Sequence, residues 1–421
     1  MASAALPSAR SSTGLLRWQG LVAAGVFATT LSSPTVIDLP IRTLLRRDLA
    51  LNETEMAGFF FLVNFAWYVK PLLGIGSDHF PLFGTRRRSY LIMAAAMAAL
   101  FWSSAGMMPL TFRALLITLV GASTMIAIGS TVMGGVLVDA GQHYKAVGRL
   151  VAVRAATESA CNMVGGPLGA ALAKASFGTA GIAISLIAFA LAPAAFVLAR
   201  DHEIPDWRPR TREPLRSVLA SALRSRPLWA VAGSLFFFYA CPGFTSTPLY
   251  FHQTATLQFS TELVGTLKLV TGLGGLAAAA IYGFVWRRVS LRYVLVGGIV
   301  TNAACTLSFL WYRSPHVALF IHAAAGFATS VVGLSFMDMA IKAAPRETEA
   351  TTFAVLMSIW NIADACSDFA GAALMNAGGV SFRQLVAINA LIPLLVLVAV
   401  PFAPATLLNR SDARRPRPLR S

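Results

Sequence analysis

Runs of about twenty apolar residues recur along this chain from one end to the other. A run of that length allows an α-helix to cross the apolar core of a bilayer, which is about 30 Å thick. Only 12% of the residues are charged, whereas a typical soluble domain is about 25% charged. The pattern therefore predicts an all-α, multi-pass membrane protein embedded in the lipid bilayer. Hydropathy places twelve transmembrane helices at residues 18–45, 56–74, 88–108, 112–138, 149–173, 177–198, 228–250, 261–285, 292–311, 315–342, 350–375 and 382–408.

The basic residues indicate how these spans are oriented. With the N-terminus in the cytoplasm, most of the 34 Lys and Arg residues fall in cytoplasmic segments. The positive-inside rule then places both termini in the cytoplasm. The membrane surface accounts for the net charge of +16, so we expect no nucleic acid partner. Arginine is far commoner than lysine, which favours a bacterial protein of the cytoplasmic (inner) membrane.

The two halves of the chain share short strings. Pro34 and Pro242 are 208 positions apart, and so are Pro40 and Pro248. The string GAAL also occurs once in each half. Matches in one order at a near-constant offset indicate a duplicated six-helix unit. The sequence therefore predicts two pseudo-symmetric six-helix bundles, residues 1–198 and 228–421, with a cytoplasmic linker at 199–227 and a basic C-terminal tail.

Two of these prolines interrupt predicted spans. Proline removes a backbone hydrogen bond and kinks a helix, and neighbouring Ser and Thr hydroxyls can satisfy the freed carbonyl. Interrupted helices at matching places in two halves indicate a transporter's binding site. We therefore expect breaks at Pro34 and Pro242 beside the cavity. The alternative is an ordinary kink that only shapes packing.

The connection between the second and third spans is both charged and bent by glycine. Gly74 is expected to end the second span, and Gly84 permits a tight turn. Asp78 and the basic run Arg86–Arg88 lie at the cytoplasmic rim. Such a connection can bind neighbouring helix ends in one conformation and release them in another, so we predict a gating loop. The alternative is a topology anchor that only follows the positive-inside rule.

Three further charged residues lie near the cytoplasmic helix ends, namely Asp139, Arg149 and Asp338. We predict ion pairs at this rim, with Asp78 and Arg149 in one cluster and Asp338 in another. The alternative is that these are solvated helix ends.

The connection also resembles the signature loop of the major facilitator superfamily, which reads Gly, three residues, Asp, then Gly and basic residues. The longer stretch KPLLGIGSDHFPLFGTRRRSYL is similar to one in the folate–biopterin transporter family, and so is APRETEATTFAVLMSIWN, which ends at Asn361. One departure is Ala66, where that family usually has proline before the tryptophan. The resemblance implies the major facilitator fold, with the second, fifth, eighth and eleventh spans lining the interface between the halves. It also implies a folate or a pterin as the cargo.

Five ionisable residues lie deep within the predicted spans, where charge is costly and usually functional. Arg154 and Glu158 are four apart, so they share a helix face and can pair. Lys268 and Asp364 lie at similar depth, and a cation there suits an anionic substrate. Asp364 and Asp368 are one turn apart and do not both ionise easily in a low dielectric, so they are a candidate proton carrier. The alternatives are purely structural ion pairs, Lys268 with Asp364 and Arg154 with Glu158.

Other motifs exclude competing classes. There is no GxxxxGK[ST] loop, which argues against a primary pump, and no HExxH or GxSxG motif. The protein is therefore not expected to be an enzyme. His252 and His322 lack partners at metal spacing and the four cysteines form no CxxC pair, so we expect neither a metal nor another cofactor.

The second span is preceded by Asn52-Glu53-Thr54, which matches a glycosylation acceptor. We interpret Asn52 and Glu55 instead as a capping box at the start of a helix.

We therefore predict a secondary active transporter, a symporter that moves a small organic anion such as a folate or pterin by alternating access. Protons are the expected coupling ion, and a monomer is the expected form. The alternative within this class is a porter for another small metabolite or drug. From other classes, a channel and a non-transporting receptor remain alternatives.

Overall fold

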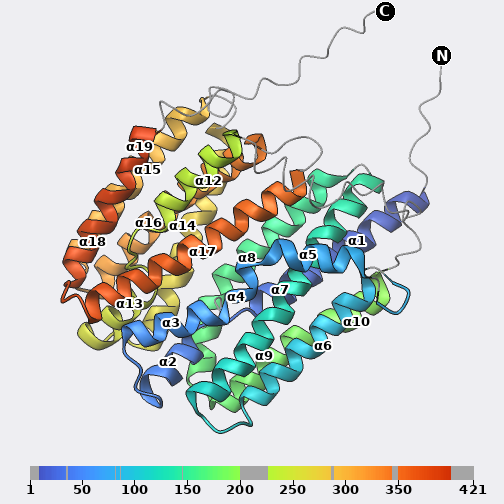
Figure 1. The fold of residues 1–421 in the computed structure, drawn as a ribbon, viewed down its shortest axis with the longest axis horizontal. Coiled ribbons are helices and arrows are strands. Elements are labelled where there is room, and N and C mark those ends of the chain that lie inside the picture. The colour runs from blue at the N-terminus through green and yellow to red at the C-terminus, as the bar shows by residue number, and fades with distance from the viewer. Residues whose placement is uncertain are drawn as a thin grey trace, which may run out of the picture.

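The structure is a computed structural model that describes residues 9–34, 37–80, 82–85, 87–144, 146–199, 226–285, 289–343 and 349–399. Within these ranges the regular structure is helical, and they contain no β-strand. This confirms the predicted all-α class. Figure 1 shows the helices of the first half, coloured blue to green, gathered on one side and those of the second half, coloured yellow to red, on the other.

Helix α3 of the first half begins at a recognisable signal. Asn52 accepts a hydrogen bond from the backbone N–H of Glu55 at 2.9 Å, and the Glu55 carboxylate accepts one from the N–H of Asn52 at 3.0 Å. The predicted capping box is thus confirmed. The helices of this half are α1 (Ala9–Leu31), α2 (Leu39–Arg47), α3 (Glu53–Val63), α4 (Phe65–Tyr68), α5 (Lys70–His79), α6 (Arg88–Ala105), α7 (Phe112–His143), α8 (Val147–Ala173), α9 (Phe177–Phe189) and α10 (Leu191–Leu198).

The second half is likewise helical. Its helices are α12 (Arg226–Tyr239), α13 (Thr247–Phe251), the π-helix η2 (His252–Thr256), α14 (Thr261–Val285), α15 (Leu291–Ser308), the 3-10 helix η3 (Phe309–Trp311), α16 (Pro315–Ala343), α17 (Glu349–Asn376), α18 (Phe382–Leu391), the 3-10 helix η4 (Ile392–Leu395) and α19 (Val396–Ala399). The predicted linker at 199–227 lies almost entirely outside the described residues.

Five helical segments of the described chain are long and apolar enough to cross a membrane. Others are shorter or interrupted, so the count of twelve spans stays a prediction. The five segments are Phe112–Gly141, Phe177–Leu198, Thr261–Tyr282, Leu291–Trp311 and Pro315–Ala340.

The spans predicted at 18–45 and 228–250 are not continuous helices. The first ends at Leu31 and resumes at Leu39, and the second ends at Tyr239 and resumes at Thr247. Both breaks therefore begin and end 208 positions apart, the offset found between the prolines. Pro34 and Pro242 lie in the gaps, because proline disfavours the α conformation of the residue before it.

Each break is covered by the GAAL glycine of its own half. A Cβ atom at Gly169 on α8 would lie 3.6 Å from Cβ of Leu39, in ordinary contact. A Cβ atom at Gly371 on α17 would collide with the backbone oxygen of Gly243. The two repeated strings thus occupy equivalent positions, each on a helix that packs against a broken segment.

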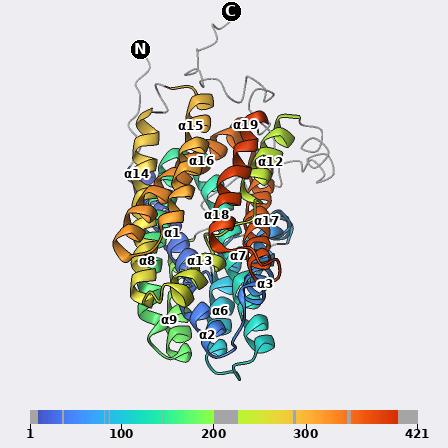
Figure 2. The same cartoon turned by 90° about the vertical axis from the view of Figure 1, so that its left-hand side faces the viewer.

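The halves meet in two places. Helix α8 packs against α14, and helix α17 packs against α3, α4 and α5. These are the helices that the family resemblance implies for the interface. Figure 2 shows α12 and α19 at one end of the molecule and α2 at the other, and we name these the α19 end and the α2 end. Near α2, Tyr250 and Val264 of the second half are buried in the same apolar cluster as Phe59 and Phe60 of the first.

Candidate functional site

A series of charged side chains crosses from one half of the molecule to the other beside α2. The ammonium group of Lys268, on α14, forms an ion pair with Oδ1 of Asp38, the residue that immediately precedes α2. The other carboxylate oxygen of Asp38 accepts a hydrogen bond from Nε of Arg42 at 2.7 Å. Asp38 therefore binds one cation from each half.

Arg42 extends this series further into the second half. Its Nη1 donates to Oγ1 of Thr247 at 3.0 Å, and its Nη2 donates to Oγ of Ser246 at 2.9 Å. Thr247 in turn donates its hydroxyl and its backbone N–H to the two carboxylate oxygens of Asp368 on α17, each at 2.7 Å. We name the connected set Lys268, Asp38, Arg42, Thr247 and Asp368 the charged chain.

The centre of the charged chain is buried. The side chains of Asp38 and Arg42 are each 7% exposed. The guanidinium carbon of Arg42 lies 4.5 Å from the ring centre of Phe60 and 5.6 Å from that of Tyr250. Buried charges are costly unless they are paired and hydrogen-bonded. Because positive and negative groups alternate here, loss of any one would leave an uncompensated buried charge.

Two further polar contacts join the halves near the charged chain. Arg46 on α2 donates a hydrogen bond to the hydroxyl of Thr254 on η2. Lys174, at the end of α8, forms a 2.5 Å ion pair with Glu262 in the first turn of α14. Together with the apolar cluster, these contacts close the α2 end across the interface.

Lys268 and Asp364 are not paired in this structure, because the ammonium group of Lys268 is held by Asp38. Asp364 has no hydrogen-bond or ion-pair partner in the described part of the chain. It is exposed, although α17 packs against the first half. Its charge acts on the phenol groups of Tyr68 on α4 and Tyr239 on α12, which places it between the two halves.

The two aspartates of α17 thus have different surroundings. Asp368 accepts two short hydrogen bonds from Thr247, each at 2.7 Å. Asp364 lies one turn away with no such donors. Of the two carboxylates, Asp364 is the one that is free to bind a proton or a substrate group.

Arg154 and Glu158 lie on α8 as expected, with Nε and Oε2 separated by 3.7 Å. Their side chains are 38% and 48% exposed, so both remain accessible on the interface helix α8. Lys70 at the start of α5 lies close enough to interact electrostatically with both. Its ammonium group donates to Oγ of Ser130 on α7 at 3.1 Å. The first half therefore holds two cations and one carboxylate close together.

The connection at residues 74–88 differs in part from its prediction. Gly74 does not end the second span, because α5 continues through it to His79. Gly84 adopts a φ of +72°, a left-handed conformation that favours glycine. Arg87 donates from Nε to Oδ2 of Asp139 at 3.2 Å, so the basic run binds the end of α7.

The structure describes two of the other rim residues, and the predicted clusters stay a prediction. Arg149 is exposed near the start of α8, and Asp338 is buried on α16. The guanidinium group of Arg88 lies over the ring of Phe196. Arg86 and the side chain of Asp78 lie outside the described residues.

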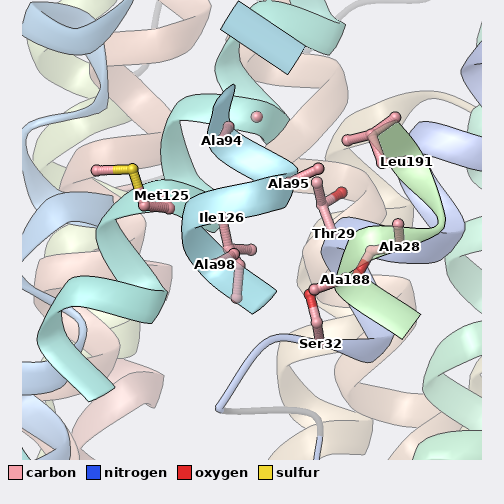
Figure 3. Close-up of a pocket in the computed structure, with 11 residues that line it drawn as sticks. Ala28, Thr29, Ser32, Ala94, Ala95, Ala98, Met125, Ile126, Ala188 and Leu191 are labelled. Atoms are coloured by element: carbon pink, nitrogen blue, oxygen red, sulfur yellow. Dashed lines mark hydrogen bonds between the residues drawn. The ribbon is translucent and has the colours of Figure 1, made fainter. Parts of the chain in front are cut away.

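A small pocket lies within the first half and is a poor site for a polar substrate. Figure 3 shows Ala94, Ala95 and Ala98 of α6 facing Thr29 of α1 and Ser32, the residue that follows α1, across it. The two hydroxyls donate to backbone oxygens of α1, at 2.7 and 2.6 Å. The pocket therefore offers mainly methyl groups.

Comparison with known proteins gives the family. The model of the BT1 family matches residues 34–413 of the 421. The chain belongs to the BT1 family. Two relatives of this BT1 protein are known as transporters: "Folate-biopterin transporter" of Synechocystis sp. (strain ATCC 27184 / PCC 6803 / Kazusa) and "Folate transporter 1" of Plasmodium falciparum (isolate 3D7). The first is 26% identical and the match covers 86% of this chain and 77% of the relative. The second is 21% identical, with coverages of 83% and 72%.

Solved structures give the fold of the BT1 protein. A D-xylose-proton symporter superposes with a TM-score of 0.71 at 15% identity, covering 94% of this chain and 98% of the symporter. The nucleoside transporter NupG gives 0.67 at 10% identity, with coverages of 93% and 98%. The predicted major facilitator fold is confirmed, and the BT1 protein is a multi-pass membrane transporter by family.

Sequence reasoning missed the centre of the BT1 protein's charged chain. Asp38 and Arg42 are four apart around Pro40, inside a span predicted at 18–45. An acid in a span was a usable signal.

His322 has more partners than the sequence indicated. It hydrogen-bonds with Thr271 at 2.8 Å and with Tyr312 at 3.1 Å, and it lies 3.4 Å from the amide nitrogen of Gln253. In the described part of the BT1 protein, no three His, Cys, Asp or Glu side chains are grouped so as to hold a metal.

Proposed function

We propose that this BT1 protein is a secondary active transporter that moves a folate or a pterin across the bilayer by alternating access. The observation that carries the proposal is the charged chain, which ties the two halves together at the α2 end by side chains alone. Two relatives named for folate and biopterin support the cargo. The exposed Arg154 and Asp364, on interface helices of opposite halves, support a polar route between the halves.

Alternating access requires a contact that closes one end and can be broken. In the proposed cycle the bundles at 1–198 and 228–421 rock about their interface, with 199–227 as the linker. The charged chain closes the α2 end, which the positive-inside rule assigns to the extracytoplasmic side. Both termini then lie in the cytoplasm, and the membrane is the bacterial inner membrane.

The α19 end requires its own closing contacts in the other half of the cycle. The connection with Gly74, Gly84 and the run Arg86–Arg88 is the proposed gating loop. Its contact between Arg87 and Asp139 supports this role. Asp78, Arg149 and Asp338 remain proposed members of the ionic contacts at this rim.

Protons are the proposed coupling ion, with Asp364 as the proton acceptor. Asp368 is held by Thr247 and fixes the position of α17 in the charged chain. Two carboxylates one turn apart do not both ionise easily in a low dielectric, so this pair is the candidate site for the coupling proton. Arg154 and Glu158 line the substrate route, whereas Lys268 serves closure through Asp38. Pro34 and Pro242 permit the helix breaks that let α2 and α13 meet.

Vesicles containing the purified protein test the cargo and the coupling. Radiolabelled folic acid and biopterin are added with and without an imposed pH difference. Saturable accumulation that increases when the outside is acidic is the expected result. Accumulation of neither compound would refute the cargo, and a set of other small anions and drugs would then test the alternative porter function. Accumulation that ignores the pH difference would refute proton coupling alone.

A further inference from the structure

Lys70 is a cation of the first half that has no close carboxylate among the described residues. It begins α5, and its ammonium group donates to Oγ of Ser130 at 3.1 Å. The same group lies 4.4 Å from the ring centre of Trp67. No Asp or Glu oxygen lies within ion-pair distance of it among the described residues, whereas Lys268 and Arg42 each have one.

The nearest charges leave this region positive. Arg154 and Glu158 both lie close enough to Lys70 to interact with it electrostatically. The two cations share one carboxylate, and that carboxylate is 3.7 Å from Arg154. Charged hydrogen bonds are usually about 2.7–2.9 Å long, so the guanidinium group is only loosely engaged. An anion entering between Lys70 and Arg154 would balance the surplus charge.

The position of Lys70 is at the interface between the halves. It follows directly on α4, where the backbone oxygen of Trp67 accepts a hydrogen bond from Asn361 of α17 at 3.4 Å. The adjacent Tyr68 is within electrostatic reach of Asp364. Trp67 of α4 thus contacts Lys70, and its neighbour Tyr68 lies within electrostatic reach of the exposed acid of the second half.

We propose that Lys70 and Arg154 form a carboxylate subsite that binds the glutamate tail of a folate. The inference rests on the proposed function and adds which part of the cargo is bound where. An ammonium group supplies a point charge with three donors, and a guanidinium group supplies a planar fork that matches a carboxylate. Ser130 and Trp67 hold the ammonium group in place by a hydrogen bond and a cation–π contact.

This assignment separates two kinds of cargo by their chemistry. Folic acid carries a glutamate tail with two carboxylates, whereas biopterin has a pterin ring and no carboxylate. A carboxylate subsite contributes to the binding of the first and not of the second. The molecule p-aminobenzoylglutamate carries the glutamate tail without the pterin ring and is therefore a probe of this subsite alone.

The test compares these three compounds in wild-type protein and in Lys70→Gln. Uptake into vesicles is measured with labelled folic acid and labelled biopterin, and binding of p-aminobenzoylglutamate to the purified protein is measured by calorimetry. We expect Lys70→Gln to raise the KM for folic acid at least tenfold, to leave the KM for biopterin within twofold, and to abolish binding of the probe. Lys70→Arg keeps the charge and is expected to retain most folic acid uptake.

The control is Arg113→Gln, which removes an exposed cation at the start of α7. It should change none of the three measurements. Equal loss of folic acid and biopterin uptake in Lys70→Gln would show a structural role and overturn the inference, as would unchanged binding of the probe. Failure of the wild-type protein to carry folic acid would instead overturn the proposed function, and the inference with it.

Discussion

Arg46 donates a hydrogen bond to Thr254, and the two residues are 208 positions apart, the offset that relates the two halves. Equivalent positions of two repeats can contact each other only where the repeats meet at their common axis. The pseudo-two-fold axis therefore passes beside α2 and η2. The charged chain lies next to this axis, where a rocking motion of the halves changes the distance between its members.

Asp38→Asn is expected to loosen the α2 end. Lys268 and Arg42 would then face each other without a carboxylate between them. Val264, buried at the interface, is replaced by cysteine in a chain lacking Cys161, Cys241, Cys305 and Cys366, and its labelling by an impermeant maleimide is timed. Labelling should be several-fold faster with Asp38→Asn. Asp48→Asn, an exposed acid at the end of α2, serves as the control and should leave the rate unchanged.

The same charges predict an order of stability. Asp38→Asn strands two cations and should reduce the free energy of unfolding by about 3 kcal/mol or more. Lys268→Gln should reduce it less, because Asp38 remains bound to Arg42 at 2.7 Å. The double variant should lose less than the sum of the two single losses. Unfolding of the purified protein in denaturing detergent measures all three. A simple sum, or a larger loss in Lys268→Gln, would contradict the pairing.

The two aspartates of α17 should give different phenotypes. Asp364→Asn is expected to remove the response of uptake to external pH, since it removes the proposed proton acceptor. Asp368→Asn is expected to keep a pH response but to increase labelling at the α2 end, since Thr247 loses its acceptor. Uptake against external pH and the maleimide assay distinguish them. An unchanged pH profile in Asp364→Asn would remove its role as proton acceptor.

The contact between Arg87 and Asp139 allows a charge swap. Asp139→Arg alone replaces the acceptor of Arg87 by a second cation and should reduce uptake strongly at normal expression. Combination with Arg87→Asp restores an opposite-charge pair and should recover part of the uptake. If both single variants transport at the wild-type rate, the contact has no part in gating.

The glycines that cover the two breaks should respond differently to alanine. At Gly371 a methyl group would meet the backbone oxygen of Gly243, which cannot rotate away, so Gly371→Ala should destabilise the protein by about 1–3 kcal/mol or more. At Gly169 the new methyl group has ordinary contacts, and Gly169→Ala should change stability little. Thermal unfolding of the two variants measures the contrast. Equal effects would show that the contact of α17 with the break is not tight.

Local patterns allowed the all-α class, the family and the capping box of Asn52 and Glu55 to be predicted from sequence. The partners of the deep charges could not be predicted, since pairing depends on which helices cross and at what depth. Lys268 lies at a depth similar to that of Asp364 by counting residues, yet α2 brings Asp38 closer. The break before α2 determines which carboxylate Lys268 binds. A continuous first helix would not place Asp38 beside α14.

The charged chain contains two cations and two carboxylates, so its formal charge is zero. Moving one elementary charge through a membrane potential of 100 mV involves about 2.3 kcal/mol. When a neutral set of charged groups separates and re-forms, almost no net charge moves, so the membrane potential performs little work on it. Any dependence of the transport rate on voltage would accordingly reflect the movement of the cargo and of any coupling ion, not the opening of the α2 end.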